Sequence, residues 1–237
     1  MTAGQYISAA NITSNLLKYV PPTNGNGTSL TTFTFQVQDN GGTANGGVDL
    51  DQSANTMTVN VTAVSDAPAG TDTTVTTNED TQYTFTAGNF GFTDSNDSPA
   101  NTLSNVRITT LPAKGSLTLN GVAVSAGQYV TAANITSGLL RYSPVGNENG
   151  SSYTTFTFQV QDNGGTANGG VDLDQSANTM TVNVTTVNDV PAGTNNTVTT
   201  NEDIQYTLTT ANFGFTDSSD SPANTLSGVR ITTLPST

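Results

Sequence analysis

Apolar and polar residues alternate strictly in two stretches of the sequence. In TTFTFQVQ (residues 31–38), Phe33, Phe35 and Val37 fall on one face, and Thr and Gln fall on the other. TMTVNVTAV (residues 56–64) alternates in the same way. A period of two residues is typical of a β-strand that buries one face. We therefore expect both stretches to be strands packed on a core.

The chain repeats itself. Thr31–Thr62 recurs unchanged at Thr154–Thr185, 123 positions later (154 − 31), and TNEDTQYTF from Thr77 returns as TNEDIQYTL from Thr200 with the same offset. Repetition at a fixed period indicates an array of structural units, and 123 residues is a common domain size. We predict that residues 1–66 are the back part of one repeat, 67–189 a complete repeat, and 190–237 the front part of the next. We expect only the complete repeat to bury a core.

Within the complete repeat, short strand-like runs alternate with turn signals at intervals of about 8–12 residues, as in a β-sandwich. Asn120–Gly121 is a favoured pair for a tight hairpin turn between SLTL and VAV. GQYISAANITSNLLKYVPP is expected to form a strand, one helical turn and a second strand. The predicted fold is all-β, with antiparallel immunoglobulin-like sandwich repeats in tandem. The residues expected in the core are Phe85, Phe90, Phe156 and Phe158, and in the first segment Leu16, Leu17 and Tyr19.

Charge and composition exclude several classes of function. The formal net charge is −13 with only five basic residues, which disfavours a nucleic-acid partner. The chain has no Cys and no His, so disulfides, thiolate sites and histidine-based catalysis are absent. No apolar run approaches the roughly 20 residues of a membrane-spanning helix, and the first residues lack a signal-peptide pattern. We expect a segment of a longer protein.

Acidic residues recur at four places, each at a predicted strand end or in a loop. Calcium takes 6–8 oxygen ligands from carboxylates, Asn side chains and backbone carbonyls, which loops readily provide. Asp and Asn in loops also cap turns by hydrogen bonds to the backbone, and this remains the alternative interpretation. Asp49 and Asp51 are expected on a solvated face. The recurring positions are Asp39/Asp162, Asp66/Asp189, Glu79–Asp80/Glu202–Asp203, and Asp94 with Asp97/Asp217 with Asp220.

These motifs carry a family resemblance. FTFQVQDNGG followed by TMTVNVTAVSDAP resembles the end of a cadherin-type domain, with its Asp-Gly loop, last strand and Asp-rich linker. TDSNDSPANTL is similar to the cadherin acidic loop, and NED to the acidic end of the first strand. LPAKGSLTLNGVAVSAGQYVTAANITSGLLRYSP resembles the cadherin-like and proteoglycan-type repeats of large bacterial surface adhesins. The resemblance covers the whole repeat and implies cadherin-like sandwiches with Ca²⁺ bound at the junctions between them.

Carried over by position, the resemblance implies two sets of calcium ligands. The linkers VSDAP and VNDVP hold fewer carboxylates than the cadherin pattern, and no Asp-Arg-Glu motif lies mid-domain. About one or two ions per junction are therefore expected. The first set is Asp66, Asp94, Asp97, Asn101 and Asp162. The second is Glu79, Asp80, Asp189, Asp217, Asp220 and Asn224, and Asp39, Glu202 and Asp203 are further candidates.

The function expected from this pattern is structural. We predict a calcium-stiffened extender repeat of a secreted bacterial surface adhesin or filament, located outside the cell. Its expected partners are neighbouring repeats or other copies of itself. The alternative is a sandwich module of an adhesin that binds glycans or ice. No enzyme is predicted, because an acid–base carboxylate pair repeated every 123 residues is unlike an active site, and no nucleophile–base pair is available without His or Cys.

In the complete repeat, residues 67–189, the residue equivalent to Thr237 has number 114, and the residue equivalent to Met1 has number 124. The C-terminal segment of one chain and the N-terminal segment of another would therefore form a repeat that lacks only the equivalents of residues 115–123. One expectation is that copies assemble head to tail by exchanging strands across this joint. The other is that the segment boundaries simply fall inside two repeats of a longer array.

Overall fold

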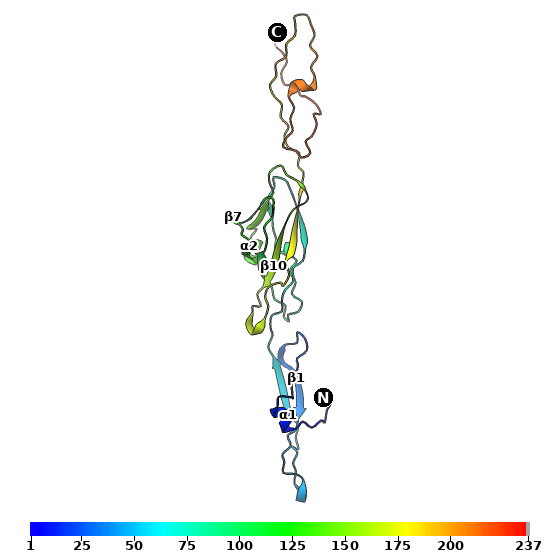
Figure 1. Ribbon diagram of the computed structural model, residues 1–237, viewed down its shortest axis with the longest axis vertical. Helices are drawn as coiled ribbons and strands as arrows, with labels where there is room; N and C mark the ends of the chain where they lie inside the picture. The colour runs from blue at the N-terminus through cyan, green and yellow to red at the C-terminus, as the bar shows by residue number, and fades with distance from the viewer. Residues whose placement is uncertain (236–237) are drawn as a thin grey trace. The chain divides into compact units, whose positions relative to one another are not determined.

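Strands make up most of the regular secondary structure in the computed structural model, which describes residues 1–235 (Figure 1). The fold is all-β, as the alternating sequence patterns predict. Close backbone contacts group the residues into two units. One contains residues 1–66 together with the loops 94–101 and 164–172, and the other contains the remaining described residues.

The larger sheet of the repeat 67–189 has five strands. Its longest strand, β10, lies between β11 and β5. Along β10, the buried side chains of Phe156, Phe158 and Val160 alternate with polar residues, as the period of two predicts. Across the sheet, the strands are β3 (Thr73–Asn78), β11 (Asn178–Thr185), β10 (Gly150–Asp162), β5 (Leu103–Ile108) and β8 (Tyr129–Thr131).

The smaller sheet has four strands and contains the predicted hairpin. Asn120 and Gly121 both have positive φ, 51° and 79°, and join two strands paired at Leu119 and Val122. Asn and Gly adopt this backbone conformation at little cost, so the turn follows from the local sequence. In order across the sheet, the strands are β4 (Tyr83–Thr84), β9 (Leu140–Ser143), β6 (Ser116–Leu119) and β7 (Val122–Ala123).

One pairing in the larger sheet is parallel, which the sequence patterns do not predict. β3, the first strand of the repeat, runs parallel to β11, the last one, with Val75 opposite Val182. All other strand pairs in the repeat are antiparallel. Because the first and last strands run in the same direction, the chain enters this sandwich at one end and leaves it at the other. This geometry suits repeats that follow one another in a row.

The core lies between the two sheets and is built on aromatic contacts. The predicted core residues Phe85, Phe90, Phe156 and Phe158 are all fully buried. The rings of Phe85 and Phe156 meet edge to face with centroids 5.7 Å apart, and those of Phe90 and Phe158 do so at 5.0 Å. Edge-to-face pairs add roughly 0.5–1.5 kcal/mol to the stabilisation from burial. The aromatic prediction is confirmed for this repeat.

The first segment repeats part of the local structure of the central repeat without its core. The two strands predicted beside AANIT form in the central repeat, as β8 and β9, but not in residues 1–26 of the first segment. β1 (Gly27–Phe35) pairs with β2 (Asn55–Val61), and Phe33 lies opposite Met57 as Phe156 lies opposite Met180. The helical turn predicted from AANIT is present in both copies. It forms α1 (Ala9–Thr13) and α2 (Ala132–Thr136), each capped by a hydroxyl. A short 3-10 turn after the first strand is also shared, as η1 (Ala44–Gly46) and η3 (Ala167–Gly169).

The prediction that Leu16, Leu17 and Tyr19 enter the core is wrong for this copy. Their side chains are exposed, whereas Leu140 and Tyr142, the counterparts of Leu17 and Tyr19, are fully buried. The local sequence is nearly the same in both copies. The difference arises because the two-stranded sheet β1–β2 has no second sheet packed against it.

Among the described residues of the third segment, 190–235, no strand is formed. The segment contains the 3-10 helix η4 (Thr210–Phe213), which copies η2 (Ala87–Phe90) with the same Thr and Asn capping contacts. An isolated bridge joins Ala192 to Thr216, as Ala69 joins Thr93 in the central repeat. Local turn chemistry is therefore retained where the partner strands are missing.

The prediction that Asp49 and Asp51 lie on a solvated face needs correction. Both are half-buried, and Asp174, the counterpart of Asp51, is only 4% exposed. Asp174 accepts hydrogen bonds from the backbone NH of Gly70 at 2.9 Å and from the Asn178 side chain at 2.7 Å. It therefore fastens the linker before β3 to the start of β11. An alternating VDLD pattern alone gives no signal of this distant contact.

Among residues 1–235, no helix is both long and apolar enough to cross a membrane.

Candidate metal centre

The loop Asp94–Asn101 is shaped by its own polar side chains. The Asp94 carboxylate accepts a hydrogen bond from the backbone NH of Asn101, which closes the loop. Asp97 accepts two hydrogen bonds of 3.1 Å from the backbone NH of Asp66 and one of 2.8 Å from the Asn101 side chain. The acidic loop is thus hydrogen-bonded to the linker aspartate, and both belong to the first set of residues that the family resemblance implies.

The same arrangement occurs 123 residues later. Asp217 accepts a 2.7 Å hydrogen bond from the backbone NH of Asn224. Asp220 accepts hydrogen bonds from the backbone NH of Asp189 at 3.0 Å and from the Asn224 side chain at 2.9 Å. The linker aspartate and the following acidic loop therefore form one recurring structural motif.

In each motif, one carboxylate oxygen is buried and lacks a hydrogen-bond donor. Asp94 is 9% exposed and Asp217 is 7% exposed. The Oδ1 atom of each has no hydrogen-bond partner, while each Oδ2 accepts from the loop backbone. A buried, unsatisfied carboxylate oxygen is energetically costly and requires an explanation. A bound cation would satisfy this oxygen in both loops.

Asp162 extends the first cluster. One carboxylate oxygen each from Asp94, Asp97 and Asp162 lie within 4.8 Å of one another. Asp162 is 2% exposed and ends β10, where it pairs with Leu103 of β5. This strand pairing brings a residue of the distant QDNGG motif to the acidic loop. Three oxygens at this separation can share one cation.

A second group of oxygen ligands lies beside Asp189. Glu79 is 1% exposed and accepts hydrogen bonds from the backbone NH of Val187 at 2.6 Å and from the Asn149 side chain at 3.2 Å. Asp80 accepts a 3.2 Å bond from the backbone NH of Asn147. With its amide oriented to satisfy its neighbours, the Asn147 side chain donates to both Asp80 and Asp189 at 3.2 Å.

Two carboxylates in these clusters, Asp94 and Asp189, have a raised pKa. Burial raises the pKa of Asp94, and the negative charges of Asp97 and Asp66 add to the increase, against the lowering effect of the hydrogen bond from Asn101. Burial also raises the pKa of Asp189, reinforced by the charges of four other carboxylates. A cation at either place would relieve this repulsion and favour the ionised forms. The carboxylates that act on Asp189 are Asp80, Asp220, Glu79 and Asp217.

The structure does not bring the three remaining candidates, Asp39, Glu202 and Asp203, into these clusters. Asp39 is exposed and accepts a 2.7 Å hydrogen bond from the backbone NH of Gly41, which is the turn-capping role that the sequence left open. Glu202 and Asp203 are also exposed. Asp162 and Glu79, the counterparts of Asp39 and Glu202, are buried within the complete repeat, whereas Asp80, the counterpart of Asp203, is exposed.

Sequence reasoning missed the asparagines that support the clusters. Asn149 links Glu79 to the backbone oxygen of Ser221 in the second acidic loop, with a bond of 2.9 Å to the latter. Asn188 accepts a 2.9 Å bond from Asn224. In a chain so rich in Asn, composition hides such positions. The one available signal is that Asn147 and Asn149 recur at the 123-residue offset as Asn24 and Asn26.

No protein-family model matches the chain, and neither the curated proteins nor the solved structures give a match. The cadherin-type resemblance therefore remains a prediction from the motifs, and the geometry of the acidic loops carries the functional argument.

The candidate ligands in these clusters are oxygens of carboxylates and of amide side chains. Hard cations prefer such ligands, and Ca²⁺ accepts irregular loop geometry more readily than Mg²⁺ does. Zinc and copper sites in proteins rely mainly on His and Cys, both of which the sequence lacks. This ligand set therefore fits a hard cation better than zinc or copper.

We predict that Glu79→Gln destabilises the repeat by about 1–3 kcal/mol, because the amide nitrogen of Gln places a donor opposite the NH of Val187 or the Asn149 side chain. Chemical denaturation without calcium measures the change. The matched variant is Glu202→Gln, at the equivalent exposed position, which should change stability by less than about 0.5 kcal/mol. Equal effects at the two positions would contradict the structural role of Glu79.

Proposed function

We propose that this chain is a calcium-stiffened structural repeat of an extracellular bacterial surface adhesin or filament. The observation that carries the proposal is the recurring junction motif. At two positions 123 residues apart, a linker aspartate is held by an acidic loop, and that loop contains a buried carboxylate oxygen with no hydrogen-bond donor.

Stiffening follows from where the ligands lie in the chain. Asp66 and Asp189 belong to the linkers, whereas Asp94, Asp97, Asp217 and Asp220 belong to the loop of the repeat that follows each linker. An ion bound by the linker aspartate and the loop aspartates together would fix the linker to the next repeat by several metal–oxygen bonds, in addition to the existing hydrogen bonds. The two linkers would then lose most of their backbone freedom.

The parallel pairing of β3 with β11 supports a role as a spacer. A repeat that the chain enters and leaves at opposite ends adds its length to an array. The acidic, cysteine-free composition is compatible with an extracellular location, where calcium modules work at affinities of about 10⁻⁴–10⁻³ M. The resemblance to adhesin repeats supports the placement at a bacterial surface.

The test is a calcium titration by isothermal calorimetry of the chelator-treated chain. We expect saturable binding that is weakened at least tenfold at one site by Asp217→Asn, since this change removes the charge but retains an acceptor for the Asn224 NH. Asp203→Asn is the matched control at concentrations where the chain is monomeric, because Asp203 is exposed and lies outside the clusters of its own copy, and it should leave binding unchanged there. Absence of calcium binding by the unmodified chain at millimolar concentrations would overturn the proposal.

A further inference from the structure

The first segment presents an unpartnered apolar sheet face. Phe33, Phe35 and Val37 are 47%, 36% and 61% exposed, whereas their counterparts Phe156, Phe158 and Val160 are fully buried. The sequences of the two strands are identical at these positions. The face on β1 and β2 is therefore a core surface without its opposing layer.

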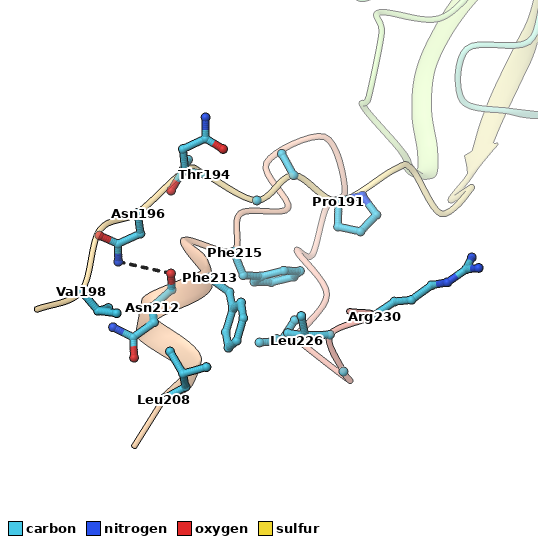
Figure 2. Close-up of a pocket in the computed structure, with 15 residues that line it drawn as sticks. Pro191, Thr194, Asn196, Val198, Leu208, Asn212, Phe213, Phe215, Leu226 and Arg230 are labelled. Carbon is cyan, nitrogen blue, oxygen red and sulfur yellow. Dashed lines mark hydrogen bonds between the residues drawn. The ribbon is translucent and has the colours of Figure 1, made fainter. Parts of the chain in front are cut away.

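The third segment presents the complementary surface. A hollow of about 600 Å³ is lined in part by Leu208, Phe213, Phe215 and Leu226. Figure 2 shows Phe213, Phe215 and Leu226 grouped around this hollow. The counterparts of Leu208 and Phe213 are Phe85 and Phe90. In the central repeat these two rings pack on Phe156 and Phe158, the counterparts of Phe33 and Phe35.

The backbone edges match in the same way. In the central repeat, β10 and β11 are flanked by β5 and β3, which both come from the front of the repeat. The sheet β1–β2 has only its two strands, so both of its edges are open. The counterparts of β5 and β3 are residues 226–231 and 196–201 of the third segment. The residues equivalent to the strands missing from the first segment are therefore present in the third segment, where they form no strand.

We propose that residues 190–235 of one copy dock on residues 1–66 of a second copy and complete a sandwich between the two chains. The occupant of each face is this same sequence, because the central repeat shows how the two halves pack when they are joined. Residues 196–201 would pair parallel with β2, as β3 does with β11. Residues 226–231 would pair antiparallel with residues 35–39, which begin at the last residue of β1, as β5 does with the end of β10. Such a contact is heterologous and does not close, so it builds a filament.

The docked copy would also contribute ligands to the first calcium cluster. A hollow of about 210 Å³ is lined by Asn24, Asn26, Asp66 and Asp97 among others. At the equivalent place in the second cluster, Glu79 and Asp80 accept hydrogen bonds from Asn149 and Asn147. Glu202 and Asp203 of the docking segment occupy the equivalent positions in its sequence and would fill this hollow. This calcium-dependent part of the inference rests on the proposed function.

The joint would be less complete than the central repeat. The strands β6 and β7 lie within residues 116–123 of the central repeat, and neither segment contains residues equivalent to them. The five-stranded sheet would be restored in full, while the smaller sheet would keep only the counterparts of β4 and β9. We therefore expect filaments that dissociate on dilution, at temperatures below the melting of the central repeat.

A disulfide between copies tests the register directly. In the central repeat, the hydroxyl oxygens of Thr109 and Thr157 are 2.6 Å apart. Their counterparts are Thr232 and Thr34, both exposed, and the chain contains no Cys. The Thr34→Cys/Thr232→Cys variant, oxidised at high concentration, should give a ladder of covalent dimers and longer species on a non-reducing gel. The matched variant Thr34→Cys/Thr200→Cys, whose second position belongs beside the far end of β2, should give at least fivefold less.

A purely monomeric band, with or without an internal crosslink, would overturn the proposal, and so would equal ladders from the two variants. Phe35→Asp should abolish assembly in sedimentation velocity while the melting of the central repeat is unchanged. Val122→Asp, at an exposed apolar position outside both faces, should leave assembly intact. If Phe35→Asp assembles as the unmodified chain does, the apolar face is not the contact.

Calcium separates the two parts of the inference. A ladder formed with calcium and reduced severalfold in chelator supports a shared cation site at the joint. An equal ladder in both conditions supports the docking and overturns the contribution of calcium to it. The proposed function is tested separately, by calorimetry at concentrations where the chain is monomeric. A chain that binds no calcium under these conditions would contradict the proposed function but not the docking.

Discussion

Replacing Phe158 with alanine is expected to lower the free energy of unfolding of the central repeat by about 3–5 kcal/mol. Phe158 is fully buried, and its ring packs edge to face against Phe90 at the centre of the sandwich. The change removes apolar burial and leaves a cavity between two sheets whose backbones are fixed by hydrogen bonds, so the site can collapse only partly. Urea denaturation of dilute protein in chelator measures the loss.

The repeat supplies a control for this variant with the same local sequence. Phe35 occupies the equivalent position in β1 but is 36% exposed, with no opposing layer in its own unit. Phe35→Ala in dilute protein should change the main unfolding transition by less than about 0.5 kcal/mol, as surface substitutions do. Comparable losses at the two positions would show that the first segment has a core of its own, contrary to the structure.

Calcium at a hundredfold excess over its dissociation constant should stabilise the folded chain by about 2.7 kcal/mol for each site. For a repeat of this size, this corresponds to a rise of about 10 °C in melting temperature. The physical reason is that the ion binds carboxylates that repel one another in the folded state and are dispersed in the unfolded one. Differential scanning calorimetry with millimolar calcium and with chelator measures the shift.

The double variant Asp94→Asn/Asp217→Asn is the control for the calcium effect. It removes the two buried carboxylates whose Oδ1 atoms have no donor, and it should abolish most of the shift while leaving the calcium-free melt unchanged or slightly higher. Identical melts of the unmodified chain with and without calcium would mean that the acidic loops only cap turns, which is the alternative that the sequence left open.

The effect of pH on the calcium-free chain has a definite sign. The folded state raises the pKa of Asp94 and of Asp189, so it holds these protons more tightly than the unfolded chain does. Their contribution to stability is fully present below the unfolded pKa of about 3.9 and is lost as the pH rises through the folded-state pKa. Calcium reverses this slope, because it binds the ionised carboxylates. The stabilisation by calcium should therefore grow as the pH rises from about 4 to 7.

Much of the candidate site could be predicted from sequence, because the repeat marks it twice. The acidic loop after the second strand and the aspartate before the first strand recur together, and the structure joins Asp66 to Asp97 and Asp189 to Asp220 by hydrogen bonds. The asparagines at 147 and 149 were missed because their role depends on strands that approach from elsewhere in the chain.

The sequence by itself determined the local elements. Alternation at period two specified β5, β10 and β11, the Asn120–Gly121 pair specified the hairpin, and AANIT formed the same helical turn in two surroundings. These features depend on backbone preferences and on neighbours a few residues away. The helical turn and the pair of alternating strands are therefore present in the first segment as well as in the complete repeat.

Only the tertiary structure decided which of these residues become a core. Thr31–Thr62 and Thr154–Thr185 are identical, yet Phe35 and Met57 are exposed while Phe158 and Met180 are fully buried. β1 ends at Phe35, whereas β10 continues to Asp162, because β5 extends the pairing of β10 alone. The parallel placement of β3 beside β11 and the burial of Asp174 were decided in the same way. Burial depends on strands supplied from distant parts of the chain, and no local pattern encodes whether those strands are present.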